Sequence, residues 1–342
     1  MTAATGLVYD ERFLLHRAPY EHPEHPGRLS AIWSRLVSDG LVPRCRRIPA
    51  REATRQELLA VHTAEHIDRI ESTALREHAQ LDPDTYTSRE SAHAALLAAG
   101  GLVDLTAAVL SRTLSNGFAL VRPPGHHAEA DQAMGFCLFN NVAVAARAAR
   151  RSGADRVLIV DWDLHHGNGT QNSFEDDPAI LYFSTHEYPY YPGTGALAEV
   201  GGGAARGRTV NVPWPAGMGD AEYLAAFDRV LLPIAHAFDP QLVLVSCGFD
   251  AADGDPLGGM RLSAEGYAAL TARVSSLAGG KVVLALEGGY NLRAIAAAAA
   301  AVTRVLLGDP RAELDPGPLH RAAERILAEA IDVHREFWPG VW

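Results

Sequence analysis

The chain has 342 residues, a formal net charge of −11, 48% hydrophobic and 21% charged residues, which is typical of a globular protein and excludes collagen-like and disordered classes. An acidic chain lacks the basic face that binds nucleic-acid phosphates, so we expect no direct contact with nucleic acid. Three cysteines without a Cys-x-x-Cys pair argue against a disulfide scaffold and against a zinc site made of thiolates.

The N-terminal segment contains neither a basic stretch nor an apolar stretch, so we expect no secretion signal. The alanine run Ala296–Ala301 is too short to cross a bilayer and is typical of a tightly packed helix. We therefore expect a cytoplasmic protein that does not bind membranes. The oligomeric state stays open, with a homo-oligomer among the alternatives.

Strands and helices alternate along the predicted chain. Apolar runs that suit strands buried on both faces of a parallel sheet occur at Gly117–Val121, Arg156–Val160, Ile180–Ser184, Thr209–Val212, Leu242–Ser246 and Lys281–Leu286. Helical spacing occurs at Asn140–Arg151, Ala221–Phe238 and Ser263–Leu277. This alternation predicts an α/β fold, a single domain with a doubly wound, mostly parallel sheet and helices on both faces.

Polar clusters follow four of these strands at the point where each strand ends. They are Arg122-Pro-Pro-Gly-His-His-Ala128, Asp161-Trp-Asp-Leu-His-His-Gly-Asn-Gly169, Cys247-Gly-Phe-Asp250 and Glu287-Gly-Gly-Tyr290. Sites in open α/β sheets form beyond the carboxyl ends of the strands. Four such clusters therefore predict one shared cavity.

The run Asp161-x-Asp163-x-His165 predicts a metal site, because residues two apart in an extended chain share a face. Asp250, at the end of another strand, is the candidate that completes the ligand set. Oxygen and nitrogen ligands suit zinc, and Fe(II), Mn(II) or Co(II) also bind such sites. In the alternative interpretation the aspartates only cap the next turn, but ligand types that share one face disfavour it.

The adjacent pair His126 and His127 suits proton transfer, and Tyr290 after two glycines suits donation to a developing oxyanion. Each signal is weak alone, since buried histidines are usually structural and Gly-Gly-Tyr is common in turns. A Gly-x-Ser-x-Gly elbow and a GxxxxGK[ST] phosphate loop are both missing from the sequence, which argues against serine hydrolases and P-loop enzymes.

Taken together, these motifs resemble the arginase/deacetylase superfamily, and within it the class II-like histone deacetylases and acetylpolyamine amidohydrolases. The resemblance covers about residues 7–310 of a single deacetylase domain at 1–342, which ends in a helical tail at about 318–336. Besides the four clusters, it rests on His22-Pro-Glu-His-Pro-Gly-Arg28, Gly135-Phe-Cys137, Phe139-Asn-Asn141, Pro192-Gly-Thr-Gly195 and Gly254-Asp-Pro-Leu-Gly258.

The resemblance implies one catalytic zinc ion, bound by Asp163, His165 and Asp250. It also implies one or two structural potassium ions, with ligands drawn from Asp161, Asp163, His165, Ser184 and Thr185. Asp161 is then not a zinc ligand.

In the mechanism that the resemblance implies, His127 is the general base and acid, and His126 stays charged beside Asp161. Tyr290 donates to the oxyanion. Asn168 lies behind His127, where class I members carry an aspartate. A neutral partner stabilises a protonated His127 less, which suits a base.

The resemblance also implies a substrate tunnel with Gly135, Phe136, Tyr191 and Leu257 along it, and an acetate exit path at Arg28. We expect hydrolysis of the acetyl amide of N-acetyl-lysine in proteins or peptides. Two alternatives remain, an acetylpolyamine amidohydrolase and an inactive acetyl-lysine-binding module. Polyamine-specific members can carry a glutamate at the position of Leu257, and every residue that the mechanism needs is present, so both alternatives are disfavoured.

Overall fold

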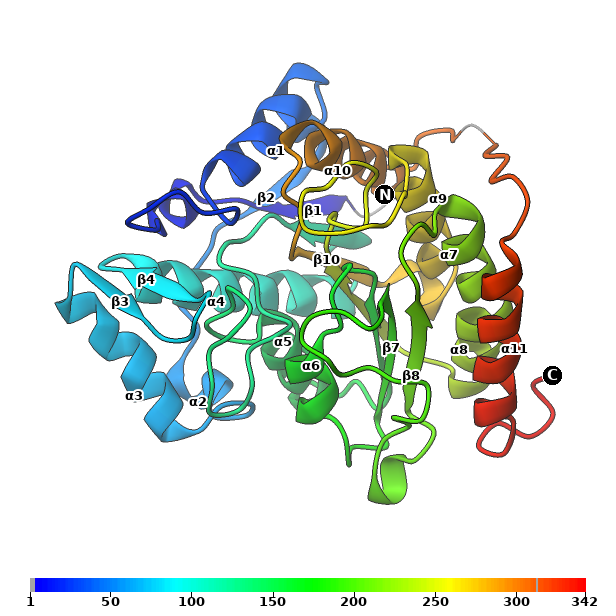
Figure 1. Ribbon diagram of the computed structural model, residues 1–342. Coiled ribbons are helices and arrows are strands. Elements are labelled where there is room, and N and C mark those ends of the chain that lie inside the picture. Colours follow the sequence, from blue (N-terminus) through cyan, green and yellow to red (C-terminus); the bar gives the residue numbers. More distant parts are fainter. Residues whose placement is uncertain (1–3, 312) are drawn as a thin grey trace.

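Eight parallel strands form the central sheet in the computed structural model, which describes residues 4–311 and 313–342 (Figure 1). Residues 1–3, on which the expectation of no secretion signal partly rests, lie outside this range. The strand order is β2-β1-β5-β10-β9-β6-β7-β8. The strands are β1 (Thr5–Val8), β2 (Arg46–Ile48), β5 (Asn116–Ala119), β6 (Val157–Asp161), β7 (Ile180–Glu187), β8 (Thr209–Trp214), β9 (Leu242–Cys247) and β10 (Val282–Leu286). A separate antiparallel pair is formed by β3 (His78–Gln80) and β4 (Tyr86–Ser88).

Helices cover both faces of the sheet, which confirms the predicted doubly wound α/β fold (Figure 1). Along one face and its loops lie α2 (Arg55–Leu58), α3 (Ala64–Ser72), α4 (Ser91–Leu110), α5 (Asn141–Arg151) and α6 (Asn168–Ser173). On the other lie α1 (Gly27–Ser38), α7 (Asp220–Ala226), α8 (Leu232–Phe238), α9 (Ala264–Ser275), α10 (Leu292–Leu306) and α11 (Arg321–Arg335).

Capping side chains begin two of the predicted helices where the sequence indicates. Asn140 accepts a hydrogen bond from the Ala143 N–H at 3.0 Å, and Ser263 accepts one from the Gly266 N–H at 2.9 Å. Such caps satisfy backbone donors that the first helical turn leaves free. The cap at Asn140 also fixes where α5 leaves the loop that carries the histidine pair.

Helix α4 alone among the described helices is long and apolar enough to span a membrane, judged by length and composition. Inside the fold, 67% of its most apolar window is buried. That burial is the pattern of a core helix, packed here between the sheet and its neighbours.

The helix predicted over Ala221–Phe238 is divided in the structure. A π-helical turn at Phe227–Leu231 separates α7 from α8. Pro233 has no N–H, so the Arg229 carbonyl four residues earlier lacks its usual helical donor. The Trp342 indole N–H donates to that carbonyl at 2.9 Å, which satisfies it from the C-terminal end of the chain.

His334 on α11 is fully buried, and neither ring nitrogen has a partner among the described residues. Burial lowers the pKa of His334 from 6.5 to about 4. Between these two pH values the unfolded chain binds a proton that the folded chain cannot accept, so folding loses stability as the pH falls through this window.

Replacing His334 by Leu removes this proton-linked loss. We expect His334→Leu to gain stability relative to the native chain on going from about pH 7.5 to about pH 5, by about 2 kcal/mol. Urea denaturation at both pH values measures the difference. His236→Leu, at an exposed position on α8, is the control and should show no such gain. An equal effect of His334→Leu at both pH values would contradict the linkage.

Candidate metal centre and the cavity above it

Asp163, His165 and Asp250 come together beyond the carboxyl end of the sheet. Strands β6 and β9 are neighbours, with Asp161 aligned to Ser246, so the segments that follow both strands emerge side by side. One ligand atom from each of the three residues lies within 4.8 Å of the other two, and all three residues are buried.

Glycines make room for this group. A Cβ at Gly248 would overlap the Asp163 carboxylate, and one at Gly288 would overlap the carboxylates of Asp250 and Asp163. Backbone donors then orient the oxygens, because the Gly288 N–H donates to Asp163 Oδ2 and the Leu164 N–H donates to Asp250 Oδ1, each at 2.8 Å. Two carboxylates and one imidazole, preoriented and buried, fit a zinc ion that keeps one coordination position open.

The electrostatics of the group favour a bound cation. Burial and the neighbouring Asp163 raise the pKa of the Asp250 carboxyl to about 7. Burial opposes protonation of His165, yet its hydrogen bonds with Asp163 and Asp250 raise its pKa to about 10. Without a metal the cluster therefore attracts protons, and a divalent cation would replace them.

Metal removal should lower stability as well as activity, because an ion that binds only the folded chain stabilises it. At free zinc about 1,000-fold above Kd the gain is about 4 kcal/mol. We expect chelation to lower the Tm of the native chain and Zn²⁺ to restore it. Asp250→Asn should bind less metal and respond less to Zn²⁺, whereas the exposed control Asp253→Asn should behave like the native chain. A full response from Asp250→Asn would contradict this ligand set.

Asp161 lies outside the metal group and holds His126. It is the last residue of β6, and its Oδ2 lies 3.1 Å from His126 Nδ1. Its other oxygen accepts the Asp163 N–H at 3.1 Å. Burial disfavours the charged ring of His126, but the Asp163 and Asp161 carboxylates outweigh burial and raise its pKa to about 10. His126 is therefore a buried cation near neutral pH.

His127, in contrast, is neutral. Burial lowers its pKa well below 6.5, and the nearby His126 and His165 lower it further. Its Nδ1 lies 2.8 Å from Asn168 Oδ1 at the start of α6, and its ring centroid lies 4.0 Å from that of His126. A charged ring beside a neutral ring suits electrostatic stabilisation by one and proton transfer by the other.

Glu287 supports the histidine pair, a role that the spacing of the motifs does not indicate. Its Oε2 accepts the N–H groups of Gly125 and His126, at 2.6 Å and 3.2 Å. A carboxylate at the end of β10 thus ties the histidine loop to the glycine turn before Tyr290. Its position in the Glu-Gly-Gly-Tyr cluster is the signal that could have indicated this role.

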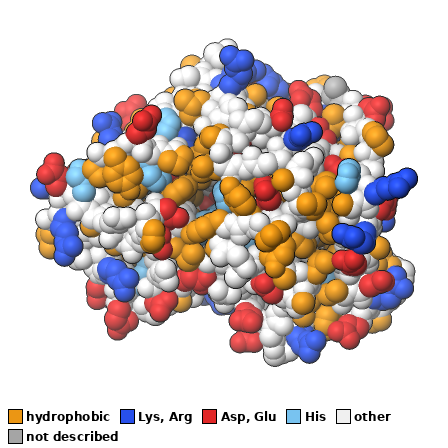
Figure 2. All heavy atoms as spheres, viewed as in Figure 1, with side chains coloured by type: hydrophobic (Ala, Val, Ile, Leu, Met, Phe, Trp, Pro, Cys, Tyr) orange, Lys and Arg blue, Asp and Glu red, His pale blue; other side chains and the backbone are white. Residues whose placement is uncertain are grey.

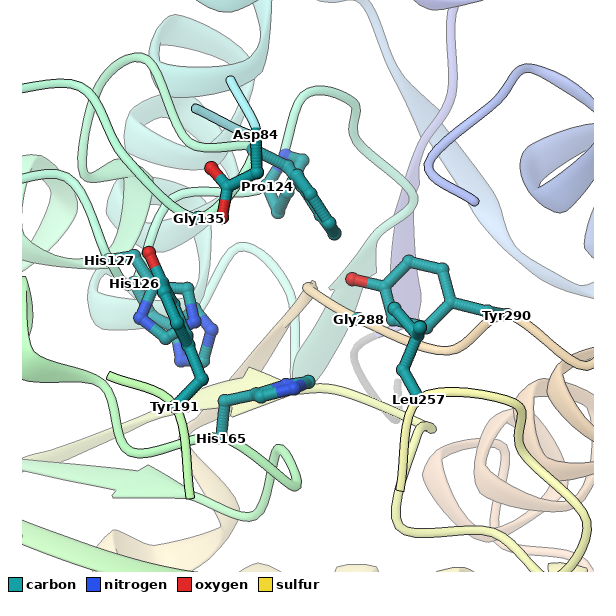
Figure 3. Close-up of a pocket in the computed structure, with 11 residues that line it drawn as sticks. Asp84, Pro124, His126, His127, Gly135, His165, Tyr191, Leu257, Gly288 and Tyr290 are labelled. Atoms are coloured by element: carbon teal, nitrogen blue, oxygen red, sulfur yellow. The ribbon is translucent and has the colours of Figure 1, made fainter. Parts of the chain in front are cut away.

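A cavity of about 70 Å³ lies above the metal group. The tyrosine hydroxyl of Tyr290 and the imidazoles of His126 and His127 point into it from opposite sides (Figure 3). The predicted tunnel residues all line it, namely Gly135, Phe136, Tyr191 and Leu257. In the space-filling view, hydrophobic side chains gather across the middle of the face, with histidines visible between them (Figure 2).

Two polar side chains also lie in the wall of the cavity. The Tyr191 hydroxyl is buried without a hydrogen-bond partner among the described residues, and Asp84, which sequence reasoning missed, also lines the cavity. Asp84 follows no strand of the main sheet, so its position gave no signal. Phe136 adopts a left-handed φ of 69° after Gly135 at 55°, and its N–H donates to Thr85 Oγ1 at 3.0 Å.

Arg28 is fully buried behind Tyr290, with its guanidinium carbon 4.8 Å from the tyrosine ring centroid. It donates to the carbonyl oxygens of Gly289 and Glu287, each at 2.5 Å, and to the Glu24 carboxylate at 2.9 Å. It thereby fixes the glycine turn that carries Tyr290. Its role in acetate exit stays a prediction.

The potassium ligands also stay a prediction. Ser184 on β7 is aligned with Asp161 on β6, which places the two ends of the proposed set side by side. The Thr185 hydroxyl accepts the Trp214 indole N–H at 2.5 Å. The side chains of both β7 residues are buried.

The sequence model of the histone deacetylase domain matches residues 22–306. The chain belongs to the histone deacetylase family. Histone deacetylase 15 of Arabidopsis thaliana is 49% identical to this chain over 99% of its length. Histone deacetylase clr3 of Schizosaccharomyces pombe and human histone deacetylase 7 are 47% and 45% identical, each over 98% of the chain.

The fold of this deacetylase-family chain matches a solved structure closely. The crystal structure of the HDA15 HD domain superposes with a TM-score of 0.95 at 48% identity, covering 100% of this chain and 97% of that one. This match confirms the arginase/deacetylase fold. The three curated relatives are longer proteins, of which the chain spans 64%, 52% and 40%.

Proposed function

We propose that the protein is a zinc-dependent deacetylase that hydrolyses the acetyl amide of N-acetyl-lysine in proteins or peptides. The observation that carries this proposal is the buried metal group of Asp163, His165 and Asp250 beneath a narrow cavity into which two histidines and a tyrosine point. A linear acyl-amine side chain fits such a cavity. Membership of the histone deacetylase family supports the same substrate class.

Zinc, when bound, supplies a Lewis acid that polarises the acetyl carbonyl and lowers the pKa of the attacking water. The chain's own residues do the rest. His127 takes the water proton at Nε2 and later gives it to the leaving amine, because its Nδ1 is engaged by Asn168. His126, kept charged by the carboxylates of Asp163 and Asp161, stabilises the developing negative charge. Tyr290 donates its hydroxyl hydrogen to the oxyanion.

An acyl-lysine substrate is favoured over an acetylated polyamine because Leu257 lines the cavity. A glutamate at this position would attract the second ammonium group of a polyamine, and leucine does not. The inactive binding module is disfavoured because the metal group, both histidines and Tyr290 converge on one cavity. We further propose bound potassium near Ser184 and action in the cytoplasm. Flame photometry on the purified protein and imaging of the tagged chain test these two points.

The oxyanion role of Tyr290 has a direct test. Tyr290→Phe deletes one hydroxyl group, and loss of such a donor lowers kcat by roughly 10²–10³-fold. An acetyl-lysine peptide assay with matched zinc content measures it. Tyr20→Phe, at an exposed tyrosine in a neighbouring pocket that Tyr290 also lines, is the control and should keep the native rate. A native kcat in Tyr290→Phe would contradict the role of Tyr290 as a hydrogen-bond donor to the oxyanion.

Leu257→Glu tests the substrate class. A carboxylate about 5 Å from a polyamine ammonium attracts it by about 3 kcal/mol at an effective dielectric near 20, before desolvation and screening. We expect the ratio of kcat/KM for an acetylated polyamine over an acetyl-lysine peptide to rise about tenfold.

The gain should shrink at high salt, because screening weakens an ion pair. Leu257→Gln, which has similar size without the charge, is the matched control. If the glutamine variant shifts the ratio equally, or if salt has no effect, charge at this position does not select the substrate.

A further inference from the structure

Behind the catalytic pair, Glu129 forms a third link in a chain that starts at His127. Asn168 Oδ1 lies 2.8 Å from His127 Nδ1, and Asn168 Nδ2 donates to Glu129 Oε1 at 2.5 Å. Asn172, one turn later on α6, donates to the same Glu129 oxygen at 2.9 Å. Two amides at positions i and i+4 of one helix face therefore grip a single carboxylate oxygen.

This arrangement removes an ambiguity that an amide by itself cannot resolve. The two ends of an asparagine side chain are nearly equal in shape, but one only accepts and the other only donates. An ionised carboxylate only accepts, so Glu129 requires the Nδ2 end of Asn168 to face it. The Oδ1 end must then face His127.

The consequence for His127 follows from the same inventory of donors and acceptors. With an oxygen acceptor at 2.8 Å, Nδ1 of the neutral ring must carry the hydrogen. Nε2 is then left with its lone pair. The tautomer that can accept a proton from the cavity therefore depends on the orientation of the Asn168 amide, whose Nδ2 donates to Glu129 Oε1 at 2.5 Å and, over a longer distance of 3.4 Å, to the His127 carbonyl oxygen.

Glu129 is itself held in place from the backbone. The His62 ring donates from Nδ1 to the Glu129 carbonyl at 2.9 Å, and the Glu129 N–H donates to the Gln132 carbonyl at 2.9 Å. Helix α6 can approach because residue 169 is glycine, where a Cβ would overlap the Ala128 carbonyl. The carboxylate is half-buried and positioned rather than free on the surface.

We propose that Glu129 is a positioning residue that fixes the Nδ1–H tautomer of His127 through the amide of Asn168. This inference rests on the proposed function, in which His127 is the general base. Glu129 is neither a proposed metal ligand nor a residue that lines the cavity, so it would act on His127 only through Asn168.

Substitutions that change the donor and acceptor character of residue 129 test the proposal on the zinc-loaded enzyme. Glu129→Gln keeps an acceptor oxygen, so kcat should stay within about threefold of native. Glu129→Lys presents a donor and turns the Asn168 amide, so kcat should fall by about 100-fold, the upper end for outer-shell partners, with KM within about threefold. Asp131→Lys makes the same charge change at an exposed neighbour and should leave kcat unchanged.

Combining Glu129→Lys with Asn168→Asp restores an acceptor beside His127 and a donor behind it. The kcat of the double variant should therefore be about tenfold or more above that of Glu129→Lys alone. Glu129→Ala, which only frees the amide, should lose about tenfold and covers the case in which Glu129→Lys lowers the Tm. Equal kcat in Glu129→Ala and Glu129→Gln, or no recovery in the double variant, would overturn the proposal.

The ring ¹⁵N shifts of His127 give a readout independent of turnover. In histidine-labelled native enzyme, with the signal assigned by its loss in His127→Ala, we expect the Nδ1–H form, and in Glu129→Lys the Nε2–H form. The same tautomer in both would overturn the proposal. A changed tautomer with unchanged kcat would support the role of Glu129 and overturn the assignment of His127 as the base, so the two failures are distinguishable.

Discussion

Three carboxylates are buried together at the end of the sheet, and hydrogen-bond donors in the surrounding structure stabilise them. Asp161, Asp163 and Asp250 are all fully buried. Isolated buried charges cost far more than a fold can offset, so each must find a cation or several donors. Backbone N–H groups and the imidazoles of His126 and His165 meet that requirement, and the glycines at 248 and 288 leave the space for it.

The same constraint gives His126 and His127 different charge states, although they are adjacent in the chain and their ring centroids lie only 4.0 Å apart. His126 has a carboxylate behind it and is charged, whereas His127 has an amide behind it and is neutral. Neither state follows from the imidazole itself. For His126 the carboxylates of Asp163 and Asp161 outweigh burial and favour the charged ring, whereas for His127 burial and the two neighbouring imidazoles favour the neutral ring.

The sequence predicts the strands of the site well because β5, β6, β9 and β10 are apolar runs that end in polar clusters. It cannot predict that these four strands are neighbours in the order β5-β10-β9-β6, since alternation along the chain carries no information about lateral order. The half-exposed β2 lacked an apolar pattern and was missed. Roles within the site came from the resemblance, and Asp84 and Glu129 were missed because contacts between loops have no regular spacing.

The hydrogen bond from Asn168 to Glu129 links two positions that are distant in the sequence, so substitutions at these positions should depend on each other in evolution. By this proposal a donor at residue 129 turns the amide of Asn168, and a carboxylate at residue 168, although it accepts from His127, also faces the carboxylate of Glu129. Either substitution alone therefore passes through an unfit intermediate, while the paired exchange preserves the acceptor at His127. Across an alignment of the family, a donor at position 129 should therefore occur together with a carboxylate at position 168, whereas an acceptor at position 129 should occur together with an amide at position 168.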